Sequence, residues 1–205
     1  MNVAQIGTTR RGLKMMLLRA LLAAAVMAVA SPASAHVGQH MGFSIGSGFA
    51  HPLLGLDHLA AMVAVGLWSA LAGGRRLWIW PAAFVGAMLA GGVIGQAGIG
   101  LPQVEPAIAV SVIVLGALVA TGLKAPVVIG AVLVAAFAIF HGHAHGAEAP
   151  VDAWAGYASG FVLATALLHL IGIAAGTALQ RGMGAMPVRA LGVATALFGV
   201  FILLG

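Results

Sequence analysis

The sequence has no cysteine, and it has very little charge. Without a thiol among its 205 residues, neither a disulfide framework nor a thiolate metal site can form. Charged residues make up only 6% of the chain, whereas a soluble domain carries about 25%. Four of the nine Lys and Arg residues lie before residue 20, and the other five are nearly balanced by four acids. The charge therefore predicts no nucleic-acid partner.

Apolar sequence is abundant instead. Hydrophobic residues make up 62% of the chain, and they recur in runs of about 18 residues or more, which is enough to cross the hydrocarbon core of a bilayer as a helix. The composition therefore predicts an all-α integral membrane protein in contact with membrane lipid.

Residues 1–35 have the pattern of a cleaved signal peptide. Basic residues at positions 10, 11, 14 and 19 precede a short apolar run at 21–30, and A-S-A follows at 33–35. The alternative is an uncleaved first helix, although the apolar run is too short to span a bilayer comfortably. Cleavage after Ala35 would leave His36 at the mature N-terminus and residues 36–205 as a single transmembrane domain.

The remaining sequence predicts six membrane-spanning helices in one compact bundle. They are expected near residues 51–71, 77–97, 105–122, 126–143, 153–179 and 188–204. Small residues recur four apart, as at Gly156 and Gly160, and this spacing suits close packing of helices in lipid. Because helices one and four each begin a set of three, the two halves would be inverted relative to each other, as in inverted-repeat membrane folds.

The basic residues predict how the chain lies in a bacterial cytoplasmic membrane. If the mature N-terminus is outside the cytoplasm, the odd-numbered loops face inward. The basic residues after the leader all fall in or beside these loops, at Arg75, Arg76, Lys124, Arg181 and Arg189. An excess of Lys and Arg is typical of cytoplasmic loops, so we expect both termini of the mature chain outside the cytoplasm.

Ionisable residues interrupt the apolar pattern in H-P-L-L-G-L-D-H at 51–58. His51 and His58 are seven residues apart and would share one face of an ideal helix, while Asp57 would point elsewhere unless Gly55 permits local unwinding. Imidazole nitrogens with one carboxylate suit nickel, cobalt, zinc or copper(II). The alternative is a buried ion pair between Asp57 and a histidine that holds helices together.

A second polar group, F-H-G-H-A-H-G-A-E, occupies residues 140–148 at the same predicted membrane depth. On a helix, His141, His145 and Glu148 would line one stripe, and His143 would face away. The two glycines in this run weaken the helix prediction, and the alternative is a solvated loop that buffers or captures metal. Ionisable residues at membrane depth usually serve function, so the two groups together predict one metal site.

Further candidates carry a weaker signal. Glu105, at the mouth of the third predicted helix, is either a cap carboxylate or a further ligand. His36 and His40 lie on the mature N-terminal arm, where the free α-amine beside His36 would help to chelate a cation. His169 is interpreted as a packed, hydrogen-bonded histidine, and Phe84 as a packing or lipid-facing group. The methionines show no clustering along the sequence.

The two motifs resemble those of the HupE/UreJ family of nickel permeases. The resemblance is carried by H-P-L-L-G-L-D-H-L-A-A-M-V-A-V-G-L-W at 51–68 and F-H-G-H-A-H-G-A-E at 140–148, and it covers the leader and all six spans. It implies uptake of Ni²⁺, or in some members Co²⁺, as a transported substrate for enzymes such as hydrogenase or urease, with no permanently bound cofactor. The family-critical positions correspond to His51, Asp57, His58, Glu105, His145 and Glu148, with His141 in the second motif and Phe84 in the second helix.

Two other classes of function stay open at this point. Histidines and carboxylates could hold zinc in an intramembrane metal-dependent hydrolase, or the chain could be a metal-sensing accessory subunit. No G-x-x-x-x-G-K-[ST] phosphate loop occurs in the sequence, so the resemblance to permeases implies a secondary transporter driven by the membrane potential. A homo-oligomer is compatible with the sequence.

The leader generates the first testable prediction. We expect the membrane-extracted protein to begin at His36, because a small-x-small site precedes it and the apolar run before it is short. N-terminal sequencing or intact-mass measurement checks this. A species that retains Met1 would contradict it.

Overall fold

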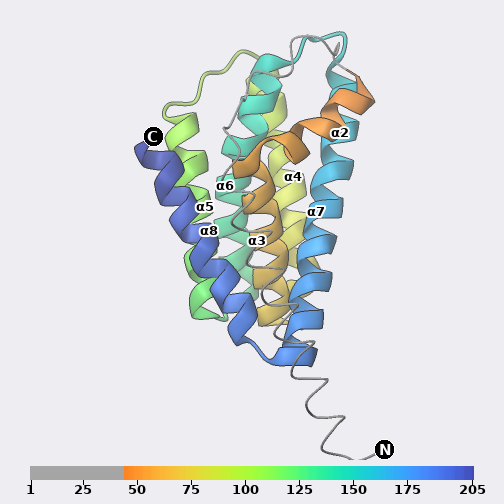
Figure 1. Ribbon diagram of the computed structural model, residues 1–205. Coiled ribbons are helices and arrows are strands. Elements are labelled where there is room, and N and C mark those ends of the chain that lie inside the picture. Colours follow the sequence, from red (N-terminus) through yellow and green to blue (C-terminus); the bar gives the residue numbers. More distant parts are fainter. Residues whose placement is uncertain (1–43) are drawn as a thin grey trace, which may run out of the picture. The chain divides into compact units, whose positions relative to one another are not determined.

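The computed structural model describes residues 44–205. The expected signal peptide at 1–35, with His36 and His40, lies outside the described residues. The described part is helical throughout (Figure 1). Its helices are α2 (Ile45–Leu54), α3 (Leu56–Ala72), α4 (Arg76–Gln96), α5 (Val104–Thr121), α6 (Val127–Glu148), α7 (Trp154–Met183) and α8 (Met186–Leu204).

The helix lengths and composition confirm the prediction of an all-α multi-pass membrane protein. In residues 44–205, helices α4 to α8 are each long and apolar enough to cross a membrane, and α2 and α3 together form a sixth, bent candidate. The expected span at 126–143 is longer than predicted, because α6 continues through the whole histidine motif to Glu148. Membrane orientation and the inverted halves stay predictions.

The first span is broken at Gly55. The axes of α2 and α3 differ by 82° across this residue, whose backbone is extended, with φ −79° and ψ 105°. Pro52 lies inside α2 and cannot donate a backbone hydrogen bond there, which weakens the helix just before the break. A Cβ at Gly55 would lie 3.1 Å from Asp57 Oδ1 and 3.3 Å from His58 Nδ1, so the glycine also leaves room for that pair.

Glycines bring the helices into backbone contact. A Cβ at Gly142 of α6 would lie 1.8 Å from the carbonyl oxygen of Met88 on α4, and one at Gly146 would lie 2.0 Å from that of Gly92. These two glycines weakened the sequence-based helix prediction, yet they form the contact surface between α6 and α4. Gly172 packs α7 against α3 in the same way. Such approaches are favourable in lipid because van der Waals packing is a main force between helices there.

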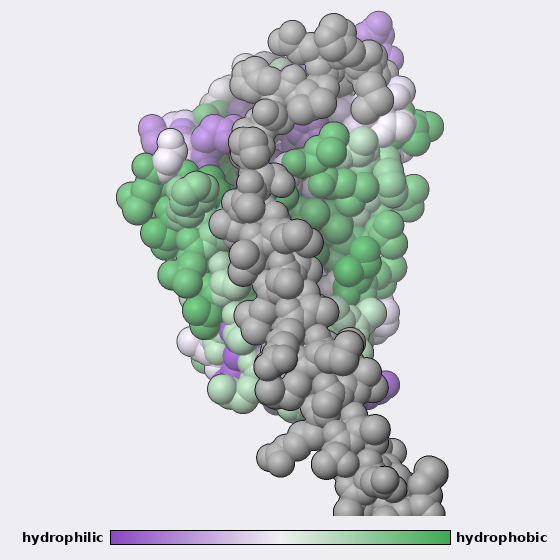
Figure 2. Space-filling model, viewed as in Figure 1, coloured by the Kyte–Doolittle hydropathy of each residue, from purple (hydrophilic) through white to green (hydrophobic). Residues whose placement is uncertain are grey.

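The loop between α5 and α6 is held by side chains from other helices. Arg76 Nε donates to the carbonyl of Ala125 at 2.7 Å, and Arg189 donates to that of Thr121. Trp68 and Trp80, whose rings stack 3.9 Å apart, donate to carbonyls in the same region. The basic residues of the described part lie at this end, opposite α2 in Figure 1. Figure 2 shows hydrophilic residues toward the two ends of the visible face and hydrophobic surface between them.

The basic end generates a prediction of orientation. We expect it to face the cytoplasm, because Lys and Arg are retained on that side. Alkaline phosphatase, which folds only after export, should therefore be active when fused after Gly205 and inactive when fused after Lys124. The reverse activities would contradict the predicted orientation.

Candidate metal site

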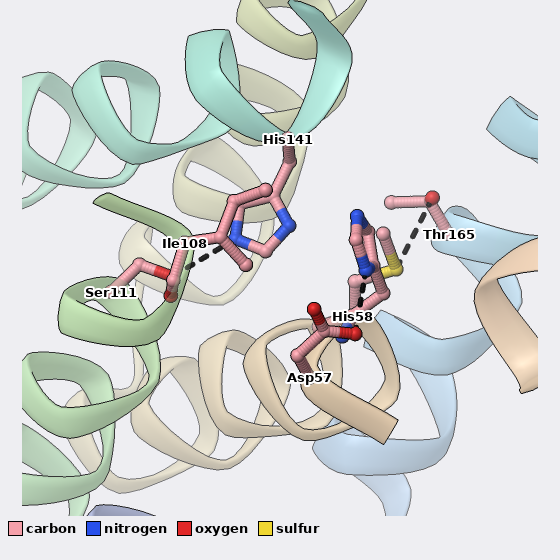
Figure 3. Close-up of polar contacts among 7 residues, drawn as sticks. Asp57, His58, Ile108, Ser111, His141 and Thr165 are labelled. Carbon is pink, nitrogen blue, oxygen red and sulfur yellow. Dashed lines mark hydrogen bonds and ion pairs between the residues drawn. The ribbon is translucent and has the colours of Figure 1, made fainter. Parts of the chain in front are cut away.

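Two motifs that are far apart in the sequence meet at the end of the bundle that carries α2. We call the four histidines at this meeting point the histidine cluster: His51, His58, His141 and His145. The ring centroids of His51 and His145 are 4.5 Å apart, and that of His58 lies 4.7 Å from His141 and 4.5 Å from His145. Figure 3 shows Asp57 and His58 of α3 opposite His141 of α6. The structure thus brings both sequence motifs to one place.

Three of the predicted ligands lie within reach of a single ion. One ligand atom each of His51, His145 and Glu148 can be chosen so that all lie within 4.8 Å of one another. Nitrogen and oxygen ligands at about 2.1 Å from a metal are at most about 4.2 Å apart, so a small inward movement of these side chains would form a coordination shell. His145 is buried, His51 is half-buried and Glu148 is exposed, so the group is accessible from the side of Glu148.

Asp57 binds its neighbour His58 through two hydrogen bonds. Its Oδ1 atom accepts from the backbone N–H of His58 at 2.7 Å and lies 2.8 Å from Nδ1 of the same residue. If the carboxylate accepts the Nδ1 proton, the lone pair is on Nε2, which is buried and has no hydrogen-bond partner among the described residues. A carboxylate that fixes a histidine in this way is common behind metal ligands. Asp57 therefore pairs with a histidine, which was the alternative to its being a metal ligand, and this same pairing would orient His58 toward a metal.

His141 is fixed in a similar way by Ser111 of α5, a residue that the sequence analysis did not identify. The Ser111 hydroxyl donates its single hydrogen to the carbonyl of Ile108 at 2.6 Å. It must therefore accept at its 2.9 Å contact with His141 Nε2, which places the ring proton on Nε2 and the lone pair on Nδ1. In residues 44–205, this Nδ1 atom is buried without a hydrogen-bond partner (Figure 3).

His145 is the buried member of the group that it forms with His51 and Glu148. Its ring packs on Phe161 with centroids 4.1 Å apart, and neither ring nitrogen has a hydrogen-bond partner in the described part of the chain. A buried polar atom left without a partner costs about 1–3 kcal/mol. Several such nitrogens around one point are a donor set that a divalent cation of intermediate hardness would satisfy, with the carboxylates opposing its charge.

The other predicted residues lie beside the histidine cluster. Glu105, in the first turn of α5, shares with Asp57 the lining of an open pocket of about 230 Å³. His143 points away, as helical periodicity predicted, and its Nε2 lies 2.8 Å from the carbonyl of Ile99. Phe84 is fully buried and contacts His141, with ring centroids 5.7 Å apart. It therefore packs inside the protein and does not face lipid.

One side-chain expectation of the sequence analysis was wrong, and one grouping of side chains was not expected. His169 is buried as expected, but within the described residues neither of its ring nitrogens is hydrogen-bonded. The methionines, scattered in sequence, are not all scattered in space: the Thr165 hydroxyl lies 3.3 Å from Met62 Sδ and 3.6 Å from Met88 Sδ. Only a tertiary contact could reveal this grouping. Ser111 did carry a faint signal, as the single polar side chain in the apolar stretch 106–120 of α5.

Comparison with known proteins agrees with this arrangement of motifs. The model of the family described as HupE / UreJ protein matches residues 24–202 of the chain. Protein HupE of Rhizobium leguminosarum bv. viciae is 46% identical over 182 residues, which cover 88% of this chain and 95% of that protein. No solved structure matches the chain.

The contact between Ser111 and His141 generates a prediction about affinity. Ser111→Ala should weaken Ni²⁺ binding by about 10–100-fold, the usual effect of removing a group that orients a metal ligand. Ser69→Ala removes another fully buried hydroxyl outside the histidine cluster and serves as the matched control. Isothermal titration of detergent-purified protein measures both. Equal affinities in the two variants would show that Ser111 does not orient a ligand.

Proposed function

The chain belongs to the HupE/UreJ family, and from that premise we propose that it carries Ni²⁺ or Co²⁺ into the cytoplasm. This family is a transporter family linked to nickel and cobalt uptake and is not an enzyme family. The proposal assigns the histidine cluster, with Asp57 and Glu148, as the site that captures the ion on the outer side of the cytoplasmic membrane. The imported metal would supply an enzyme such as hydrogenase or urease.

One observation carries the proposal. Residues 51–58 and 141–148 meet at one end of a membrane bundle, with imidazole rings 4.5–4.7 Å apart. A polar cluster at such a position is costly in hydrocarbon and is normally retained for a substrate or ion. Neutral imidazoles with two carboxylates also fit the chemistry of nickel and cobalt better than that of magnesium or calcium, which favour oxygen ligands.

The proposed capture proceeds by replacing water with protein ligands. His51, His145 and Glu148 would receive the ion first, because Glu148 is exposed and His145 is buried. His58 and His141 lie next to them and present lone pairs oriented by Asp57 and Ser111. The carboxylates offset the positive charge, which would otherwise be expensive to move away from water. Glu105, which shares a pocket with Asp57, would attract the cation toward the site.

The membrane potential is a sufficient energy source for the proposed uptake. Each elementary charge gains about 2.3 kcal/mol per 100 mV on moving inward, so a divalent ion gains about 4.6 kcal/mol. At about 1.4 kcal/mol for each tenfold concentration ratio, this supports accumulation of roughly a thousandfold. A secondary permease therefore needs no nucleotide.

The carboxylate of Asp57 is the sharpest test of this function. Asp57→Asn keeps nearly the same shape but removes the negative charge and the strong acceptor for His58, so initial uptake of labelled Ni²⁺ should fall at least about tenfold. Uptake should be measured in cells that lack other nickel permeases and be normalised to membrane-inserted protein. His58→Ala and His145→Ala should behave alike.

His143→Ala is the matched control for this test, because it removes a buried imidazole that points away from the cluster. Its effect on uptake should be milder. Normal uptake by Asp57→Asn would refute the proposed role of Asp57 and leave the residue as a structural partner of His58. Absence of metal accumulation with the wild-type protein in proteoliposomes would instead favour an accessory or sensing function.

A further inference from the structure

A fifth buried histidine lies outside the histidine cluster. His169 of α7 has 1% of its surface exposed, and both of its ring nitrogens lack hydrogen-bond partners within residues 44–205. An apolar side chain at such a position would avoid the free-energy cost of an unpaired buried donor. Packing alone therefore does not explain why this position carries an imidazole.

Phe84 connects His169 to the histidine cluster. The Phe84 ring packs edge-on against His169, with centroids 5.1 Å apart and planes at 86°, and it also contacts His141 at 5.7 Å. Its own exposed fraction is zero. The aromatic ring thus contacts both a cluster histidine and the unpaired His169, so a cation that moves from one imidazole to the other would pass close to Phe84. The ring face itself attracts cations.

Other donor atoms lie beside the same route. Thr165 precedes His169 by one helical turn on α7, and its hydroxyl lies close to the sulfur atoms of Met62 and Met88. Figure 3 labels Thr165 and marks one contact of its hydroxyl with a sulfur atom. Met62 follows His58 by four residues on α3, and Met88 follows Phe84 by four residues on α4. Residues four apart share a helix face. Helices α3, α4 and α7 therefore each place a sulfur or oxygen atom in this interior region. Met62, Met88 and Thr165 are all essentially unexposed.

We propose that His169 is a second cation-binding station, which an ion reaches from the histidine cluster by passing Phe84. Met62, Met88 and Thr165 line the step between the two stations, where thioether sulfur and hydroxyl oxygen replace part of the lost hydration. Imidazole suits borderline cations such as Ni²⁺, and neither imidazole nor the softer thioether is a preferred ligand of Mg²⁺ or Ca²⁺. This inference rests on the proposed transport function and extends it toward the basic end of the bundle.

Capture of the ion by the histidine cluster and its passage beyond Phe84 are measured in separate assays. Purified wild type, His169→Leu and His169→Gln are compared in two assays: equilibrium Ni²⁺ binding in detergent, and initial Ni²⁺ uptake into proteoliposomes under an imposed potential. In His169→Leu, binding should stay within about twofold of wild type, because the histidine cluster is intact. Uptake should fall about tenfold or more, because one donor to a charge is missing from an apolar interior. His169→Gln retains a polar terminus and should recover part of the rate.

A matched control removes a buried imidazole outside this route. His143→Leu loses its contact with the Ile99 carbonyl but none of the donors near Phe84, and it should keep most of the uptake. Thr165→Val is a second, nearly isosteric variant that removes only the hydroxyl. It should slow uptake several-fold with unchanged binding, and it keeps the test available if His169→Leu does not fold.

The outcomes distinguish this inference from the proposed function. Wild-type rates in His169→Leu, or in both His169→Gln and Thr165→Val, would overturn the second station and leave transport intact. Parallel loss of binding, uptake and thermal stability in all His169 variants would also overturn it, because that pattern indicates a packing role. If the wild-type protein neither binds nor transports Ni²⁺, the proposed function itself fails.

Discussion

The site depends on the contact between α6 and α4. Gly142 and Gly146 place the α6 backbone against carbonyl groups of α4 at distances that no side chain could fit, and this contact fixes the rotation of α6 about its axis. Because neighbouring residues on a helix differ by about 100°, His141 and His145 then turn toward α3 while His143 turns toward Ile99. The glycines therefore determine which histidines can meet the ion.

Much of the fold could be predicted from the sequence. Hydropathy predicted the spans, and helical spacing separated His143 from His141 and His145. The sharp break at Gly55 was only partly predictable, because an isolated glycine permits a bend but does not specify its angle. The contact of Ser111 with His141, and the grouping of Met62 and Met88 around Thr165, could not be predicted, since they depend on the relative rotation of helices that are far apart in sequence. For His169, burial was predictable but the absence of a partner was not.

The two ends of the bundle differ in how their buried polar groups are hydrogen-bonded. At the basic end, Arg76, Trp68 and Trp80 donate hydrogen bonds to backbone carbonyls near the loop between α5 and α6, so these carbonyls are paired and the contacts contribute to stability. At the other end, buried nitrogens of His58, His141 and His145 stay unpaired within the described residues. Proteins commonly accept such local costs where a ligand is to be bound, and the stabilised end offsets them.

The break at Gly55 also changes how far an ion must travel through material of low dielectric constant. At 1.5 Å per residue, the 17 residues of α3 extend over about 25 Å, which is less than the hydrocarbon thickness of about 30 Å. With α2 bent by 82° at this point, Asp57 and His58 would stand below the hydrocarbon boundary if the far end of α3 reaches the opposite boundary. In that arrangement, the electrostatic barrier for a dehydrated divalent ion would be thinner than the membrane itself.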